Sequence, residues 1–364
     1  MAAQTAPLSA DTTAKRPLIR RFAPDRSQKI RHTVQGLFLL LNAGLGLQFV
    51  LWVRYFERGG RGLYLPRPAG VEGWLPIAGL MNTKYFLTTG HVPVIHPAAM
   101  FLFLAFAGMS LLVKKAFCAW LCPVGTLLEY AAGLGRRVFG RNMRLPRWAD
   151  IPLRGMKYLL LVFFVFAIAA MSAQALEQFM QTPYGLVADV KMLNFFREIG
   201  PTGAIVIGFL FLGSLLVQNF WCRYLCPYGA LLGLVSLLSP VKIRRDSEAC
   251  ADCGKCAKAC PAGLAVNQLV QIRSAECMAC MECVAACSAQ DALQLALPPR
   301  RNAPRKERWT RRAVGPFTTA CVLAYIFMAA VLFARVTHHW NTEMSRSVYQ
   351  RFVPLADVLG HPGM

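Results

Sequence analysis

Charged residues are scarce in this chain. Only 16% of its 364 residues are Asp, Glu, Lys or Arg and 55% are apolar, whereas about 25% charged residues are usual in soluble domains. The chain also lacks a phosphate-binding loop, a nucleotide-binding G-x-G-x-x-G after a strand and a serine-nucleophile motif. These absences argue against an ordinary soluble enzyme, and the chain lacks a convincing site for organic catalysis.

Five apolar stretches contain no charged residue and are long enough to cross a hydrocarbon core of about 30 Å. They are residues 33–53, 92–113, 158–176, 199–220 and 313–334. We therefore expect an α-helical polytopic membrane protein with about five transmembrane helices.

Basic residues outnumber acidic ones by 40 to 18, which gives a net charge of +22. With the amino terminus inside, 30 of the 40 basic residues fall on the inner side of the five stretches, as the positive-inside rule requires. The amino terminus is then cytoplasmic and the carboxyl terminus periplasmic. The basic run at 300–312 is expected to touch anionic membrane lipid, and no nucleic-acid partner is expected.

Twelve of the 13 cysteines fall into four regularly spaced groups. The pattern C-x2-C-x2-C-x3-C occurs twice between the fourth and fifth stretches, 27 residues apart. It is typical of 4Fe–4S ligation, in which the last cysteine of each motif binds the cluster of the other motif. One cluster is therefore assigned to Cys250, Cys253, Cys256 and Cys287, and the other to Cys260, Cys277, Cys280 and Cys283.

Zinc and disulfides fit this pattern poorly. Zinc sites usually pair two C-x2-C motifs across a longer segment, and disulfides are rare on the reducing cytoplasmic side.

The second and fourth stretches end in related sequences, MSLLVKKAFCAWLCPVGTLLEY at 109–130 and GSLLVQNFWCRYLCPYGALLGL at 213–234. Both copies run inward, so this is an internal parallel repeat. Cysteines four residues apart share a face of a continuous helix, and the following proline ends that helix, kinks it or opens the next one. The cysteines concerned are Cys118 and Cys122 in the first copy, and Cys222 and Cys226 in the second.

Four thiolates from the two C-x3-C-P motifs are a candidate third redox centre, either an iron–sulfur cluster or another metal. A thiol relay or a transient Cu(I) site is the first alternative, since Cu(I) favours thiolate. Packed structural cysteines are the second.

The paired C-x3-C-P motifs and the following two-cluster segment resemble the membrane polyferredoxins of the NapH and NosR type. The stretches VEGWLPIAGLMNTKYFLTTG at 71–90, IHPAAMFLF and FCAWLCPVGTLLEY look like the short branch of electron-transport proteins exemplified by YccM. The resemblance covers roughly residues 30–300. It implies a bacterial inner-membrane protein that passes electrons between the quinone pool, or a cytoplasmic donor, and a partner reductase chain.

The resemblance also bears on partners and cofactors. It implies quinone or quinol, and redox proteins such as reductase or cytochrome subunits, as partners. NosR-type proteins carry a large outer flavin-binding domain for which this chain has no room, so covalent flavin is not expected.

The expected organisation has six segments. They are a cytoplasmic basic tail (1–32), a four-helix membrane domain with both C-x3-C-P motifs (33–239), a small α+β two-cluster ferredoxin-like domain (240–299), a basic linker (300–312), a fifth transmembrane helix (313–334) and a periplasmic tail (335–364).

His96 and Glu177 are candidates for taking up the protons released when quinol is oxidised. Interfacial hydrogen bonding and a solvated end residue are the respective alternatives. The predicted function is an electron-transfer subunit, a candidate component of a quinol dehydrogenase rather than a stand-alone enzyme. The alternative is a redox-active assembly or regulatory factor, for example one that reduces copper while an oxidase or reductase matures.

Overall fold

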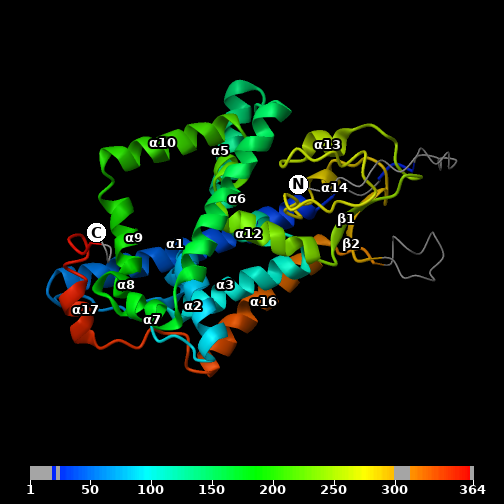
Figure 1. The fold of residues 1–364 in the computed structure, drawn as a ribbon. Helices are drawn as coiled ribbons and strands as arrows, with labels where there is room; N and C mark the ends of the chain where they lie inside the picture. Colours follow the sequence, from blue (N-terminus) through cyan, green and yellow to red (C-terminus); the bar gives the residue numbers. More distant parts are fainter. Residues whose placement is uncertain (1–18, 22–24, 299–311, 361–364) are drawn as a thin grey trace. The chain divides into compact units, whose positions relative to one another are not determined.

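The computed structural model describes residues 19–21, 25–298 and 312–360, so the basic linker lies outside the described residues except for Arg312. The chain is mostly helical (Figure 1) and divides into two compact units. The cysteine unit contains all 13 cysteines and comprises Met1–Phe38, Ala107–Tyr158 and Leu212–Tyr325. The second unit comprises Leu39–Phe106, Leu159–Phe211 and Ile326–Met364.

In the described part of the chain, three helices are long and apolar enough to cross a membrane, namely α1 (Ser27–Glu57), α6 (Arg147–Ala170) and α16 (Pro316–Val336). A fourth span is available if α9 (Ala188–Arg197) and α10 (Pro201–Leu216), which are bent by 80°, are counted together. The second apolar stretch forms α3 (Pro97–Leu112), which has only 16 residues. Proline opens both α3 and α10, because it fits the first turn of a helix but not its interior. The expected five spans therefore stay a prediction.

The cysteine unit holds several short helices and a two-stranded sheet. They are α4 (Ala116–Trp120), α5 (Pro123–Phe139), α11 (Phe220–Tyr224), α12 (Pro227–Val235), η2 (Ser236–Leu238), β1 (Lys242–Arg245), α13 (Lys255–Ala259), α14 (Glu282–Ala285) and β2 (Leu293–Ala296).

The antiparallel strands β1 and β2 hold the two ends of the ferredoxin-like segment together, with Lys242 opposite Ala296 (Figure 1). The amino-terminal residues also join this segment. The Arg21 backbone N–H donates to Ser288 O at 3.0 Å, and Ile19 O accepts from the Gln290 N–H at 2.9 Å. The sequence alone assigned these residues only to a basic tail.

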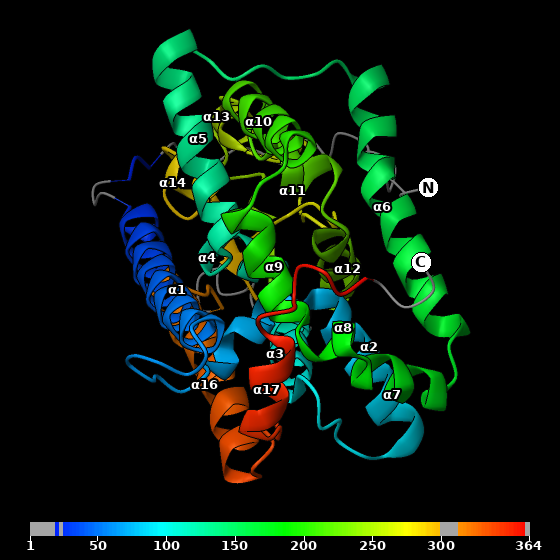
Figure 2. The same cartoon turned by 90° about the vertical axis from the view of Figure 1, so that its left-hand side faces the viewer.

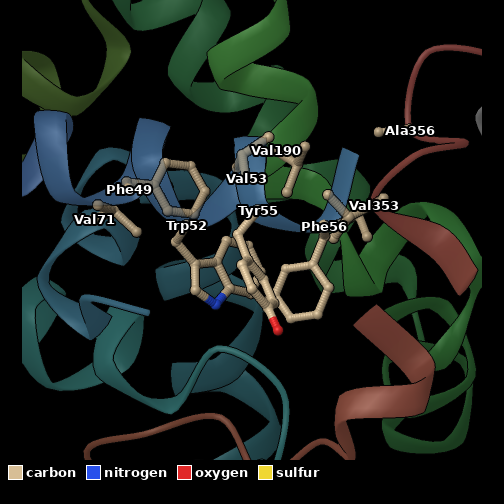
Figure 3. Close-up of a cluster of buried hydrophobic side chains, with 10 residues drawn as sticks. Phe49, Trp52, Val53, Tyr55, Phe56, Val71, Val190, Val353 and Ala356 are labelled. Carbon is tan, nitrogen blue, oxygen red and sulfur yellow. The ribbon is translucent and has the colours of Figure 1, made fainter. Parts of the chain in front are cut away.

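The second unit contains η1 (Ala69–Trp74), α2 (Pro76–Thr89), α7 (Ala173–Gln181), α8 (Pro183–Leu186) and α17 (Arg346–Phe352). Helices α2 and α7 lie side by side (Figure 2). A buried cluster that includes Trp52 and Phe56 of α1 forms one core (Figure 3). Trp52 packs edge-on against Phe56 and Tyr349. The carboxyl-terminal segment adds Val353 and Ala356 to this core, so the described tail is part of the unit.

Candidate functional site

The C-x3-C-P cysteines lie where one helix ends and the next begins. Cys118 lies in α4 and Cys122 is the amino-terminal cap of α5. Cys222 lies in α11 and Cys226 is the amino-terminal cap of α12. The two cysteines of each motif therefore do not share one continuous helix face. The proline that follows each motif, Pro123 or Pro227, is the first residue of the next helix.

The structure brings the four thiols of the two motifs together. Each cysteine is half-buried, and the sulfur of Cys222 interacts electrostatically with those of Cys118, Cys122 and Cys226. The Gly229 N–H donates to Cys226 Sγ at 3.2 Å. Burial raises the pKa of all four thiols, that of Cys122 to about 11. A set of four thiolates at this place therefore requires a bound cation or cluster to compensate their charge.

Four cysteines of the ferredoxin-like segment form a second group, called the exposed group here because it contains the exposed Cys253, although its Cys256 is buried. Cys287 interacts electrostatically with Cys250 and Cys253, and Cys256 interacts with Cys250 and Cys287. Cys253 is exposed, and Cys250 and Cys287 are half-buried. This group combines three cysteines of the first motif with the last cysteine of the second.

The other four cysteines form a buried group. Cys260 interacts electrostatically with Cys277, and Cys283 interacts with both of them. Cys280 interacts with Cys260 and Cys283. All four are buried and line one cavity. Cys283 also interacts with Cys256, so the buried and exposed groups are neighbours.

Both C-x3-C-P motifs make hydrogen bonds to the loops of the buried group. Trp120 Nε1 donates to the backbone oxygen of Ala279 at 3.1 Å, and Arg223 Nη1 donates to that of Pro261 at 3.1 Å. Trp120 and Arg223 lie between the cysteines of their motifs. Ala279 lies between two cysteines of the buried group, and Pro261 directly follows a third. The repeat is therefore attached to the backbone that carries the buried group.

Asp150 on α6 holds Arg223 in place. Its carboxylate accepts hydrogen bonds from Arg223 Nε and Nη2, both at 3.0 Å, and from the Tyr224 hydroxyl at 2.7 Å. The sequence did not single out Asp150. Its position just before an apolar stretch is a signal that could have found it, because acidic residues near membrane segments are usually paired.

His96 lies just before α3 in the second unit and is 3% exposed. Its Nε2 is 2.9 Å from the backbone oxygen of Gly185. A carbonyl oxygen only accepts, so Nε2 carries the hydrogen. The other ring nitrogen, Nδ1, lies 3.4 Å from Glu72 Oε1 and 3.3 Å from Arg67 Nη2. Nδ1 is therefore the atom at which His96 would gain a proton.

Glu72 is the centre of a buried charge cluster around His96. Its Oε1 accepts hydrogen bonds at 2.8 Å from Arg67 Nη1 and from Thr342 Oγ1. Arg67 Nη2 also donates to Asp189 at 2.7 Å. Burial alone would raise the pKa of Glu72, but the charge of Arg67 and the hydrogen bond that protonated His96 donates outweigh it and lower the pKa to about 2. Sequence reasoning missed this cluster, because Asp189 and Thr342 lie far along the chain from Arg67 and Glu72.

Glu177, the other candidate proton acceptor, has a different environment. Its side chain is exposed on α7 and accepts a hydrogen bond from Gln181 at 3.3 Å, one turn further along the same helix. The side-chain contacts of His96 lead instead to Glu72, Arg67 and Gly185. They do not link the two candidates.

The sulfur groups fit 4Fe–4S clusters better than a single metal ion. Within residues 19–21, 25–298 and 312–360, no three His, Cys, Asp or Glu side chains are placed to share one ion. Ligands of a 4Fe–4S cluster bind four separate iron atoms and need not converge on one point. Four soft sulfur donors in each group are also the donor type that iron–sulfur clusters use.

Comparison with known proteins agrees with this donor chemistry. A family model described as a 4Fe-4S binding domain matches residues 95–142 and again 199–246. Each match contains one C-x3-C-P motif. A second model, described as a 4Fe-4S dicluster domain, matches residues 242–288. No solved structure matches the chain.

Three curated relatives show how far the likeness extends. YccM of Escherichia coli (strain K12), provisionally named an electron transport protein, is 49% identical over 331 residues, which are 91% of each chain. Protein NirI of Paracoccus denitrificans is 31% identical over 57% of this chain and 30% of its own length. The ferredoxin-type protein NapH of Escherichia coli is 30% identical over 51% of this chain and 61% of its own length. The chain therefore belongs to the YccM family of ferredoxin-type proteins with 4Fe–4S binding domains.

Proposed function

We propose that the chain is an iron–sulfur electron-transfer protein of the bacterial inner membrane. It relays electrons between the quinone pool, or a cytoplasmic donor, and a partner reductase chain. The name of the relative YccM and the two 4Fe–4S family models support electron transfer. The three candidate spans support a membrane location, and the distribution of basic residues supports a cytoplasmic ferredoxin-like segment.

The exposed group and the buried group each hold one 4Fe–4S cluster in this proposal. The electrostatic neighbours of the sulfur atoms support crossed ligation, because Cys287 joins the first motif and Cys260 joins the second. Bound clusters would supply one-electron transfer. The protein tunes such centres through burial and hydrogen bonds. Here it shields one group from water and leaves Cys253 of the other open to a redox partner.

A third centre at the four C-x3-C-P cysteines completes the proposal. The 4Fe–4S binding model covers both motifs, and the four sulfur atoms are electrostatic neighbours. The alternatives are a Cu(I) site and packed free thiols.

The observation that carries the proposed function is the attachment of both C-x3-C-P motifs to the buried group. Trp120 bonds to Ala279, and Arg223 bonds to Pro261. These bonds support a C-x3-C-P site next to the buried group, and the electrostatic interaction of Cys283 with Cys256 supports a buried group next to the exposed one. The three sites then form a series that ends at the exposed Cys253.

Quinol oxidation is the finer part of the proposal, with His96 as proton acceptor. Nδ1 of His96 faces the Glu72 carboxylate, which would stabilise the imidazolium form. The proton is taken up at Nδ1, while Nε2 keeps its hydrogen bond with Gly185.

Iron analysis of anaerobically purified protein tests the number of centres. Three 4Fe–4S clusters predict about 12 Fe per chain, and two predict about 8. Cys118→Ser and Cys222→Ser should each lower the iron content from about 12 toward about 8 Fe per chain. Wild-type protein with about 8 Fe, unchanged in both variants, would contradict the third centre. Copper that is lost in these variants would favour the assembly factor.

Reoxidation of reduced clusters in liposomes tests the quinone link. A lipophilic quinone should reoxidise the reduced clusters at a rate that saturates with quinone concentration. A water-soluble quinone and a Cys253→Ser variant serve as controls. We expect His96→Gln to slow this reaction and Glu177→Gln to leave it unchanged. Clusters that stay reduced would shift the proposal to a relay fed by a protein donor.

A further inference from the structure

Two adjacent lysines, Lys114 and Lys115, are buried directly before α4. They are 0% and 3% exposed. The corresponding positions of the second copy are Gln218 and Asn219, so only the first copy carries these charges. A buried ammonium group is costly unless anions or hydrogen-bond acceptors surround it. The groups around each lysine therefore indicate which negative charge its ammonium group stabilises.

Lys115 shares one carboxylate with a second buried lysine. Its Nζ lies 3.9 Å from Glu276 Oε2. Lys157 Nζ lies 2.6 and 2.7 Å from the two oxygens of the same carboxylate, which also accepts a hydrogen bond from the Tyr158 hydroxyl at 3.3 Å. Two ammonium groups and one carboxylate leave a net positive charge in this cluster.

The remaining positive charge lies beside the C-x3-C-P site, because Lys115 is the amino-terminal cap of α4 and its backbone oxygen accepts a hydrogen bond from the Cys118 N–H at 3.3 Å. The ammonium of Lys115 interacts electrostatically with the sulfur atoms of Cys118, Cys222 and Cys226. Lys157 also interacts with Cys118 and Cys226. Four thiolates around a 4Fe–4S core form an anion. This anion would balance the net positive charge of Lys115, Lys157 and Glu276.

We propose that Lys115 is a positioning residue that compensates the charge of the C-x3-C-P centre and raises its reduction potential. The inference rests on the proposed third centre. When the centre accepts one electron, it gains one negative charge and no proton. The nearby ammonium group stabilises this more negative state, because charges interact strongly in a poorly hydrated site. The charge around an iron–sulfur cluster is one of the factors that set its potential.

Lys114 provides a matched control. Its Nζ donates to the backbone oxygens of Ser236 and Ser274, at 3.3 and 3.0 Å. Its electrostatic partner among the cysteines is Cys277 of the buried group. Lys115 also interacts with Cys277, less strongly than Lys114 does. Neutralising Lys114 should therefore change the buried group and spare the C-x3-C-P centre.

The experiment is an anaerobic potentiometric titration of the full chain, with dithionite as reductant and electron paramagnetic resonance as readout. The signal that disappears in Cys118→Ser identifies the C-x3-C-P centre. We expect Lys115→Gln to make its reduction about tenfold less favourable, a fall of about 59 mV for one electron. Lys115→Arg should keep the reduction potential of this signal near the wild-type value. Lys114→Gln should also leave the reduction potential of this signal unchanged.

The outcomes separate the inference from the proposed function. Wild-type protein with about 8 Fe and no signal that depends on Cys118 would overturn both. About 12 Fe with equal potentials in Lys115→Gln and Lys115→Arg would overturn only the role of Lys115. If Lys115→Gln does not fold, Glu276→Gln tests the same charge cluster with the opposite sign. Glu276→Gln removes a carboxylate and should raise the reduction potential of the C-x3-C-P centre. An unchanged or lower reduction potential would overturn the inference.

Discussion

Trp120 donates its indole hydrogen to the backbone oxygen of Ala279, at 3.1 Å, and each residue lies between two cysteines. Trp120 is 0% exposed and Ala279 is 1% exposed. The bond joins a C-x3-C-P motif to the loop that carries two cysteines of the buried group. The side chain of Trp120 thus links two candidate redox sites.

Replacing Trp120 by Phe should loosen this link. The change leaves the buried oxygen of Ala279 without its donor, at a cost of about 1–3 kcal/mol. We expect faster amide hydrogen exchange in residues 277–283, measured on the anaerobic protein. Trp74→Phe is the control, because Trp74 is 38% exposed and bonds to Asn42 in the second unit. Equal exchange in the two variants would count against the link.

Gly125 and Gly229 occupy equivalent positions of the repeat but tolerate a side chain differently. A Cβ on Gly125 would collide with the backbone oxygen of Cys118. A Cβ on Gly229 would meet its nearest atom, Cys226 Sγ, at an ordinary 3.5 Å. Gly125→Ala should therefore displace Cys118 and lower both the iron content and the melting temperature, while Gly229→Ala should change little. Equal behaviour of the two variants would contradict the asymmetry.

Crossed ligation predicts which cysteine variants share a phenotype. Cys260→Ser and Cys277→Ser should remove the same paramagnetic signal, since both residues belong to the buried group. Cys287→Ser and Cys250→Ser should remove the other. If Cys260→Ser instead removed the signal that Cys250→Ser removes, each motif would hold its own cluster. Iron content measured on the same samples would show whether whole clusters are lost.

The buried Glu72 predicts a loss of stability in acid. Its pKa is lowered from a usual value near 4.5 to about 2, so its contribution is fully present above about pH 4.5 and is lost as the pH falls toward 2. The difference corresponds to about 3 kcal/mol at neutral pH.

Melting temperatures of wild-type and Glu72→Gln protein, recorded in detergent from pH 6 to pH 3, check this prediction. The wild type should be the more stable at pH 6, and the gap should narrow as the pH falls. Glu177→Gln, at an exposed position, should follow the wild type throughout. A constant gap between wild type and Glu72→Gln would show that ionisation of Glu72 does not contribute.

The spacing of cysteines and prolines along the sequence was enough to predict part of the candidate site. Ligands of a cluster come from short loops, so the C-x2-C-x2-C-x3-C pattern already indicates which sulfur atoms can surround one core. The helix starts at Pro123 and Pro227 follow from proline geometry in the same way. The length of α3 did not follow from its apolar stretch, because Pro97 begins the helix after that stretch has started.

The sequence by itself determined the family resemblance, the cysteine pattern and the apolar stretches, because spacing and composition are properties of neighbouring residues. Only the tertiary structure decided which backbone oxygens Trp120 and Arg223 reach. It also decided that Glu72 lies beside His96 and that Lys115 lies beside the C-x3-C-P thiols. The physical reason is that a backbone acceptor has no side-chain signature, and the environment of a buried charge is set by segments that meet only when the chain has folded.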